Sequence, residues 1–327
     1  MEKLPRGKLL REILKNYFEE VEGILGVAIC DRDGFIIASE FIEGDEEESD
    51  SVLGAISAIL DNYIERIKSE FGAQGNFFNM TSTGDKKFAF CSQGPQSILT
   101  TVTDQSTSDT ELKVYSEHIA GKIELILDGN EEVSTEIPEI VKALARTKIG
   151  ALPKLAAEYS NKIILTGDFR VGKTSLIRRF VENAFKEDYI STIGVQISKK
   201  TINLTEQNKM NFIVWDIGGQ SFQMAPYRAR FYNGANAAVI VIDRTSPGNL
   251  DSVEKWYNDI KTSVSKNIPV VIVGNKSDLT DQIVISKDEI KEVAKRFDFH
   301  YILTSTKTGE NVHDAFLYIA YRVIETL

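Results

Sequence analysis

The chain has 327 residues, 42% of them hydrophobic and 26% charged, a composition typical of soluble globular proteins and a length that suits two domains. No apolar run approaches the ~20 residues that span a bilayer, and the N-terminus has no signal-peptide core. The formal net charge is −10, and residues 1–130 carry 12 basic against 24 acidic side chains, which argues against nucleic acid as a partner.

Residues 1–128 alternate helices with short strands and are predicted to form the first domain. Apolar residues at helical spacing predict a helix near the start, followed by two strands within 26–39 that turn at Asp33-Gly34. A helix from Val52 to Ile67 comes next, then three strands within 75–103 and a closing helix over 111–127. The lone His118 in that last helix is interpreted as a surface residue.

This order of helix, two strands, helix, three strands and helix resembles the roadblock family over about 125 residues. The resemblance rests on topology and hydrophobic pattern. It implies an α+β domain with a five-stranded antiparallel sheet that forms homodimers and partners or regulates small GTPases. An intramolecular regulator and a longin-like trafficking domain of related topology remain as alternatives.

Residues 129–160 are predicted to be a linker that contains one short helix. Ile137, Ile140, Val141 and Leu144 recur at helical spacing around Pro138. We expect this helix to pack on one of the two domains.

From residue 161 to 327 apolar strands alternate with amphipathic helices, which predicts an α/β domain with a mostly parallel six-stranded sheet and helices on both faces. The run Gly167-x-x-x-x-Gly172-Lys173-Thr174 lies between a strand and a helix, the context of a phosphate-binding loop. Backbone N–H groups there attract phosphate, Lys173 adds a positive charge, and Thr174 offers a hydroxyl ligand to Mg²⁺.

Asn275-Lys276-Ser277-Asp278 directly follows a buried strand and predicts which base is bound. The Asp278 carboxylate can accept hydrogen bonds from N1–H and the N2 amino group of guanine, which adenine does not offer. An ATPase would require Asp278 to be idle and is the weakest interpretation.

Together these motifs resemble a small GTPase of the Ras superfamily, similar to its Rab-like and Arf-like branches, over about 165 residues. The resemblance implies that Phe185 packs edge-on against guanine, that Tyr189 covers the phosphates, and that Thr192 completes the Mg²⁺ shell when the γ-phosphate is present. It also implies that the segment Ser305-Thr306-Lys307 presents a backbone N–H to guanine O6 and stacks an aliphatic stem on the base.

Besides the segment around Thr192, a second segment is expected to respond to the bound nucleotide. It begins where Asp216 ends an apolar strand, in position to hold Mg²⁺ through water. Gly219 can bring its N–H to the γ-phosphate because it has no Cβ, and Gln220 matches the residue that orients the attacking water. Loss of the γ-phosphate would remove the contacts that Thr192 and Gly219 make in the GTP-bound state. Both segments would then relax, and their conformation would depend on the nucleotide that is bound.

The site predicted from these motifs binds GTP or GDP with Mg²⁺. Catalysis is assigned to Gln220, Lys173 and Thr192, and the metal to Thr174, Thr192 and Asp216. The predicted nucleotide-binding residues are Gly167, Val171, Gly172, Lys173, Thr174, Ser175, Phe185, Tyr189, Thr192, Gly219, Asn275, Lys276, Asp278, Ser305, Thr306 and Lys307.

Phe169 and Arg170 depart from the family pattern, which usually has small residues in this part of the phosphate loop. A phenyl group there would crowd Gln220 and an incoming arginine finger, so we expect slow intrinsic hydrolysis. Arg170, Arg228 and Arg230 are candidates for stabilising charge in cis, although solvated or partner-binding arginines are the preferred interpretation.

The expected function is a GTP-hydrolysing switch that is dimerised or regulated through its first domain. A scaffold that binds GTP but hardly hydrolyses it is the alternative; Phe169 favours it, whereas Gln220 and Thr192 oppose it. Unknown effectors and exchange or activating factors would be further partners.

A cytoplasmic location without a lipid anchor is expected. The Met-Glu start and the absence of a terminal cysteine disfavour myristoylation and prenylation. Cys30 and Cys91 lack metal-ligand spacing and are interpreted as buried thiols in a reducing compartment. Basic residues beside leucines in the first fifteen positions would suit a membrane-surface helix, but packing of those leucines into the first domain is preferred.

Overall fold

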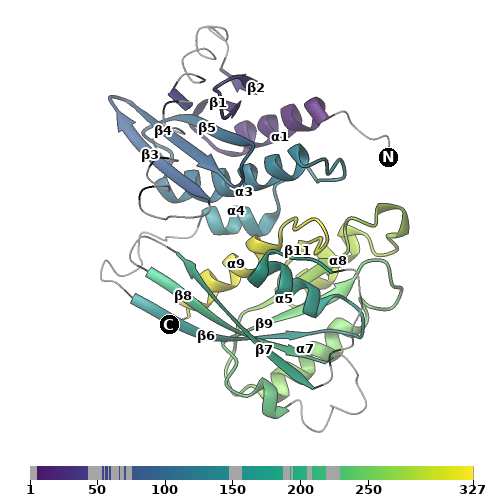
Figure 1. Cartoon of the computed structure of the whole chain (residues 1–327). Coiled ribbons are helices and arrows are strands. Elements are labelled where there is room, and N and C mark those ends of the chain that lie inside the picture. Colours follow the sequence, from purple (N-terminus) through teal and green to yellow (C-terminus); the bar gives the residue numbers. More distant parts are fainter. Residues whose placement is uncertain are drawn as a thin grey trace. The chain divides into compact units, whose positions relative to one another are not determined.

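A computed structural model describes residues 6–42, 76–146, 157–186, 194–204, 208–218 and 229–326, together with positions 54, 56, 57, 59, 66, 70 and 192. The chain divides into two compact units, Met1–Thr147 and Lys148–Leu327 (Figure 1). Most of the helix predicted from Val52 to Ile67 lies outside the described residues.

The first unit contains the five-stranded antiparallel sheet that the sequence predicted, with strand order β2-β1-β5-β4-β3. Its strands are β1 (Ile24–Asp31), β2 (Ile36–Phe41), β3 (Phe77–Thr83), β4 (Lys86–Ser92) and β5 (Ser97–Asp104). The residues of the central strands β1 and β5 are almost all buried, whereas β2 and β3 form the two edges of the sheet.

Two helices, α1 (Arg6–Glu20) and α3 (Asp109–Leu127), pack on this sheet. The Tyr17 hydroxyl of α1 lies 3.3 Å from Thr101 Oγ1 on β5 and 3.1 Å from Ser116 Oγ on α3, so one side chain joins all three elements. Burial raises the pKa of Tyr17 to about 12. The preferred inward packing of the leucines is confirmed by the buried residues of α1, which are Leu9, Leu10, Ile13, Leu14 and Tyr17. The surface position expected for His118 is wrong, because that side chain is buried on α3.

Helix α4 (Glu139–Ala145) belongs to the first unit, although the prediction placed it in a linker from 129 to 160. It packs on α3, and its Ile140, Val141 and Leu144 side chains are fully buried. Lys142 Nζ of α4 also pairs with Glu20 Oε2 at the end of α1, 2.5 Å away. The first unit therefore continues beyond residue 128, because the apolar face of α4 is covered only when it packs on that unit.

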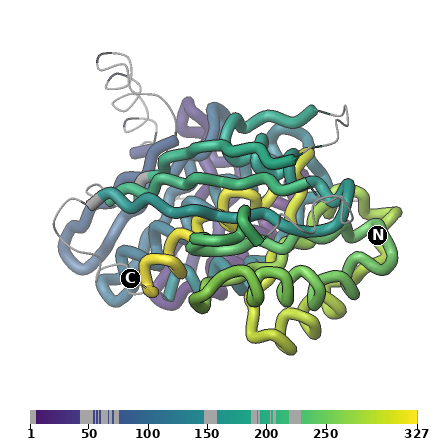
Figure 2. The backbone as a smooth tube through the Cα atoms, turned by 90° about the horizontal axis from the view of Figure 1, so that it is seen from below, coloured from purple at the N-terminus to yellow at the C-terminus, as the bar shows by residue number. Residues whose placement is uncertain are grey.

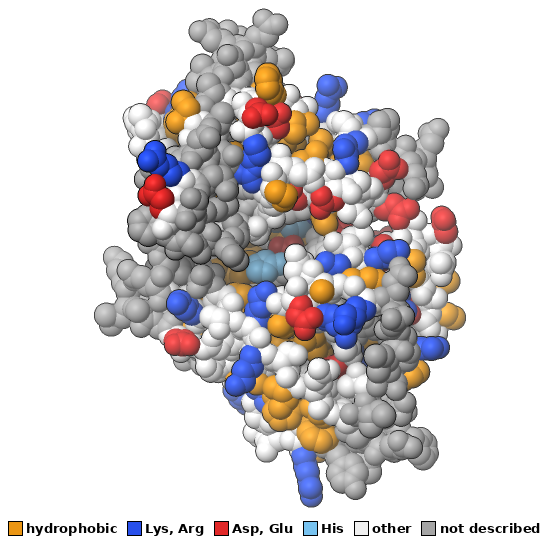
Figure 3. Space-filling view, in the orientation of Figure 1, with side chains coloured by type: hydrophobic (Ala, Val, Ile, Leu, Met, Phe, Trp, Pro, Cys, Tyr) orange, Lys and Arg blue, Asp and Glu red, His pale blue; other side chains and the backbone are white. Residues whose placement is uncertain are grey.

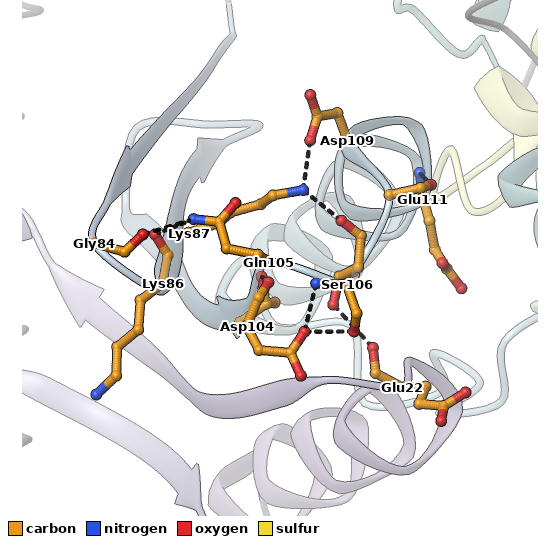
Figure 4. Close-up of polar contacts among 12 residues, drawn as sticks. Glu22, Gly84, Lys86, Lys87, Asp104, Gln105, Ser106, Asp109 and Glu111 are labelled. Carbon is orange, nitrogen blue, oxygen red and sulfur yellow. Dashed lines mark hydrogen bonds and ion pairs between the residues drawn. The ribbon is translucent and has the colours of Figure 1, made fainter.

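A polar network closes the corner between β5 and α3 (Figure 4). Lys87 Nζ donates to Asp109 Oδ1 at 2.9 Å and to the Thr107 carbonyl at 2.6 Å, and its side chain is largely buried. Asp104 Oδ1 accepts the Ser106 N–H at 2.8 Å, and hydrogen bonds from Ser106 hold the pKa of this carboxyl below its usual value. These contacts fix the N-terminus of α3 at the end of the sheet.

The second unit contains a six-stranded sheet with strand order β11-β10-β9-β6-β8-β7, in which only β7 and β8 pair antiparallel. Figure 2 shows its teal-to-green strands side by side. The strands are β6 (Ala157–Thr166), β7 (Val195–Asn203), β8 (Asn208–Ile217), β9 (Ala237–Asp243), β10 (Val270–Asn275) and β11 (His300–Leu303). Strand β6 begins before residue 161, the predicted start of the domain, because residues 157–161 pair with β8.

Helices cover both faces of this sheet (Figure 1). On one face Phe180 of α5 (Lys173–Glu182) stacks on Phe316 of α9 (Val312–Ile324), with ring centroids 3.8 Å apart and planes 10° apart. On the other face Trp256 of α7 (Ser252–Ser263) and Ile290 of α8 (Lys287–Arg296) join one core cluster. A short 3-10 helix, η2 (Thr280–Gln282), follows β10. Parallel strands end at one edge, so the loops after β6, β9, β10 and β11 converge there.

The surface charge follows the asymmetry of the sequence. In the view of Figure 3, red Asp and Glu side chains are numerous over the first unit, and blue Lys and Arg side chains are spread over the second. In the part of the chain that the structure describes, no helix is long and apolar enough to cross a bilayer.

Candidate functional site

Two glycines shape the loop between β6 and α5. Gly167 has φ 138°, and a Cβ atom there would lie 2.2 Å from the Val241 carbonyl oxygen. Gly172 has φ 99°, and its Cβ atom would lie 2.3 Å from Asn275 Nδ2. Any other residue at either position would push this loop away from β9 or β10.

Lys173 folds back over this loop. Its Nζ donates to the carbonyl oxygens of Gly167 at 2.8 Å and Asp168 at 2.7 Å. Burial lowers the pKa of Lys173 to about 8, while Asp216 and Asp168 oppose that shift. The ammonium is thus already placed above the loop where an anionic ligand would neutralise it.

Three side-chain oxygens meet next to Lys173. Thr174 Oγ1 lies 2.7 Å from Thr192 Oγ1 and donates to Asp216 Oδ2 at 2.5 Å, and Thr192 Oγ1 lies 3.4 Å from the same carboxylate oxygen. The second oxygen, Asp216 Oδ1, is buried and has no hydrogen-bond partner among the described residues. Burial raises the pKa of Asp216. This all-oxygen set with one unsatisfied carboxylate oxygen fits Mg²⁺, which prefers hard oxygen ligands.

Asn275 links the loops after β10 and β11 to the loop between β6 and α5. This fully buried side chain donates through Nδ2 to the Val171 carbonyl at 2.9 Å. Its Oδ1 accepts from Thr304 Oγ1 at 3.2 Å and from the Thr306 N–H at 3.3 Å. One amide therefore fixes three loops that are far apart in the sequence.

Asp278 is held by the neighbouring loop. Ser305 Oγ is fully buried and donates to Asp278 Oδ1 at 2.6 Å. Lys276 has φ 68°, and its Nζ pairs with Asp243 Oδ2 at 2.5 Å. Ser305 thus orients the Asp278 carboxylate.

These segments enclose a cavity of about 550 Å³. Its wall contains eleven predicted site residues: Gly172, Lys173, Thr174, Ser175, Phe185, Thr192, Asn275, Lys276, Asp278, Thr306 and Lys307. Gly167, Val171, Asp216 and Ser305 lie behind this wall and support it through the contacts above. Tyr189, Gly219, Gln220 and Arg228 lie outside the described residues.

The cavity wall also holds side chains that the motif analysis treated as departures or missed. Phe169 lines it with 42% of its surface exposed, and Arg170 lies next to it with φ 66°, its guanidinium carbon 5.8 Å from the Phe169 ring centroid. Arg178 and Lys186 were missed because they belong to no motif; helical spacing four residues beyond Thr174 could have indicated Arg178. Arg230 is exposed and is not among the lining residues that the structure describes.

Sequence comparisons agree with this geometry. The profile of the Ras family matches residues 162–325, which lie within the second unit. The Ras-related protein Rab-1 of Theileria parva is 37% identical over 164 residues, covering 50% of this chain and 74% of that protein. The Ras-related protein RABA4b of Arabidopsis thaliana is 32% identical over 170 residues, covering 52% of this chain and 75% of that protein. The chain therefore belongs to the Ras family, with a Rab-like GTPase domain in its C-terminal half.

Proposed function

We propose that this chain is a molecular switch that binds Mg²⁺ with GTP or GDP and hydrolyses GTP slowly. The observation that carries the proposal is the Asp278 carboxylate, oriented by Ser305 at the wall of a cavity that also holds Lys173. Asp278 would accept from guanine N1–H and N2, and the segment Ser305-Thr306-Lys307 would present a backbone N–H to guanine O6. The buried, reduced thiols of Cys30 and Cys91 fit a reducing cytoplasm.

Other residues of the same cavity would bind phosphate and Mg²⁺. Lys173 would hold phosphate oxygens, and Thr174, Thr192 and Asp216 would hold Mg²⁺, which neutralises phosphate charge when bound. Thr192 would lose its contact with Mg²⁺ when the γ-phosphate leaves. The segment around Thr192 would therefore be sensitive to which nucleotide is bound. Gln220 would orient the attacking water, as the family resemblance implies.

Calorimetry with GTP, GDP and ATP tests the proposal. The wild-type chain should bind both guanine nucleotides and reject ATP, because adenine would leave the Asp278 carboxylate unpaired. Asp278→Ala should lose guanine affinity, whereas Asp281→Ala, an exposed carboxylate on η2, should keep it. Equal uptake of ATP and GTP by the wild-type chain would contradict the assignment.

For the rate of hydrolysis, Phe169 supports a slow enzyme. Its exposed phenyl ring lines the cavity and would crowd the space that the attacking water and an arginine finger need. The alternative, a scaffold that holds GTP without turnover, rests on the same residue. A single-turnover assay separates the two, because a scaffold would retain GTP for hours.

We further propose that the first unit is a roadblock-like module that dimerises the chain or regulates its nucleotide cycle. Its strand order supports this, and so does the edge strand β3, which pairs only with β4 among the described residues. Phe77, Phe78 and Met80 of β3 are only partly buried. An apolar edge strand offers unpaired backbone groups to a second copy.

Light scattering on the full chain tests the dimer. Asn79→Lys combined with Thr81→Lys adds charge to two exposed positions of β3, and a β3-mediated dimer should dissociate. Asp33→Lys, at the turn beside the opposite edge, is the matched control. A wild-type chain that stays monomeric at all concentrations would contradict dimerisation, and unchanged hydrolysis in a dissociated variant would contradict regulation through the dimer.

A further inference from the structure

The guanidinium of Arg179 clamps the loop between β11 and α9. Its Nε donates to the Thr306 carbonyl at 2.9 Å, and its Nη2 donates to the Lys307 carbonyl at 2.5 Å. Its Nη1 donates to the carbonyl of Asn183 at the end of α5, 3.1 Å away. All three nitrogens of the fork are therefore used, and burial lowers the pKa of Arg179.

The turn at Gly309 lies beside the stem of Arg179. Gly309 has φ 95°, and a Cβ atom there would lie 3.5 Å from Arg179 Cδ. The Gly309 N–H donates to the Ser305 carbonyl at 2.8 Å, which closes the turn around the arginine stem.

The clamp fixes the direction of one peptide group in the cavity wall. The Thr306 carbonyl and the Lys307 N–H belong to the same peptide, and a trans peptide points these two groups in opposite directions. When Arg179 draws the carbonyl toward α5, the Lys307 N–H must point the other way. Thr306 and Lys307 both line the cavity, so this N–H belongs to a peptide of the cavity wall.

The same contact strengthens the donor. A carbonyl that accepts a charged hydrogen bond polarises its peptide, and the N–H of that peptide becomes a better donor. Arg179 also lies on α5, the helix whose first residues Lys173, Thr174 and Ser175 line the phosphate side of the cavity. It therefore joins the part of the site that reads the base to the part that holds phosphate.

From these contacts we infer that Arg179 is a positioning residue for guanine recognition: it holds the Lys307 N–H in place for the purine O6 atom and thereby sets the lifetime of bound nucleotide. The inference rests on the proposed binding of guanine nucleotides. Arg179 does not touch the nucleotide in this scheme, because it acts through the loop.

The first experiment measures release of a fluorescent GDP analogue from the full chain. Arg179→Gln should release it about tenfold faster, since it loses the charged hydrogen bonds to both carbonyls. Arg179→Lys should show a smaller effect, because one ammonium can keep part of the clamp. Arg322→Lys, an exposed arginine of α9 that pairs with Glu325, should release GDP at the wild-type rate.

The second experiment separates positioning from a general effect on folding. Each folded variant is titrated with GDP and with 6-thioguanosine diphosphate, which keeps N1–H and the 2-amino group but has a weakly accepting sulfur in place of O6. Arg179→Gln should weaken GDP binding about tenfold and change the affinity for the thio analogue much less. Equal losses for both ligands would overturn the inference. A wild-type chain that fails to bind GDP would instead overturn the proposed function.

Discussion

The indole N–H of Trp256 on α7 donates to Oδ1 of Asp168, in the loop between β6 and α5, at 3.1 Å. Trp256 is 1% exposed, and the Asp168 carbonyl accepts one of the two Lys173 hydrogen bonds. The indole thus holds a negative side chain in place beside the proposed phosphate site at Lys173. We expect Trp256→Phe to weaken GTP and GDP binding about tenfold, because a charge-assisted hydrogen bond is lost while an aromatic ring still fills most of the space.

Asp168→Asn provides the control for this prediction, measured by the same nucleotide titration. An asparagine keeps the acceptor oxygen but carries no charge, so removal of the indole N–H should cost less in its background. If Trp256→Phe costs the same affinity in both backgrounds, its role is packing alone.

Phe169→Gly should raise the single-turnover rate of GTP hydrolysis. The substitution removes the exposed phenyl ring from the cavity wall and opens the space for the attacking water. A quenched time course with bound GTP gives the rate, and a parallel titration checks that GTP affinity is retained. An unchanged rate at full occupancy would mean that the ring does not limit the chemistry.

Glu111→Gln should stabilise the chain at pH 7 and have no effect in acid. Burial raises the pKa of Glu111, and Glu20 and Glu22 reinforce the shift while Arg146 opposes it. A carboxyl whose folded pKa lies above its unfolded value destabilises the fold when charged, and this penalty disappears once the pH falls below the unfolded value. Because the side chain is only partly buried, we expect a gain of a few tenths of a kcal/mol.

Thermal unfolding at pH 7 and pH 4 checks the sign, with Asp85→Asn as an exposed control. A gain for Glu111→Gln that is larger at pH 4 than at pH 7 would refute the explanation.

Phe316→Ala should destabilise the second unit by about 3–5 kcal/mol. The substitution removes the ring that stacks on Phe180 at 3.8 Å and meets Phe212 edge-on at 6.0 Å. Phe35→Ala, whose ring is 71% exposed, should change stability by less than about 0.5 kcal/mol. Denaturant titration gives both values, and similar losses in the two variants would contradict this packing.

Local patterns carried most of what could be predicted from the sequence. The glycine-rich loop from Gly167 to Thr174 and Asn275–Asp278 each lie within a few residues, and the strands of the first unit are short apolar runs bounded by turns, so their structures follow from short segments. The long-range contacts that hold the site in place do not follow from short segments. Arg179 reaches Thr306 across 127 positions and Trp256 reaches Asp168 across 88, and no periodicity encodes such contacts.

The first unit of the structure extends beyond residue 128, its predicted end, for a related reason. The polar residues after Asp128 are typical of a linker, and only the fold reveals that Lys122 is 2% exposed and donates to the Ser134 and Glu136 carbonyls. Burial of α4 on α3 is likewise a tertiary contact that the helix spacing alone could assign to either domain.

The packing of α4 determines where the chain can be truncated to obtain the first unit alone. A fragment that stops near residue 130 would expose the surface of α3 to water and strip a buried lysine of both carbonyl partners. Such a fragment would be prone to aggregation. Its molar mass in solution would then reflect association through the newly exposed surface of α3, and not the oligomeric state of the intact first unit. Fragments of the first unit should therefore run through Arg146.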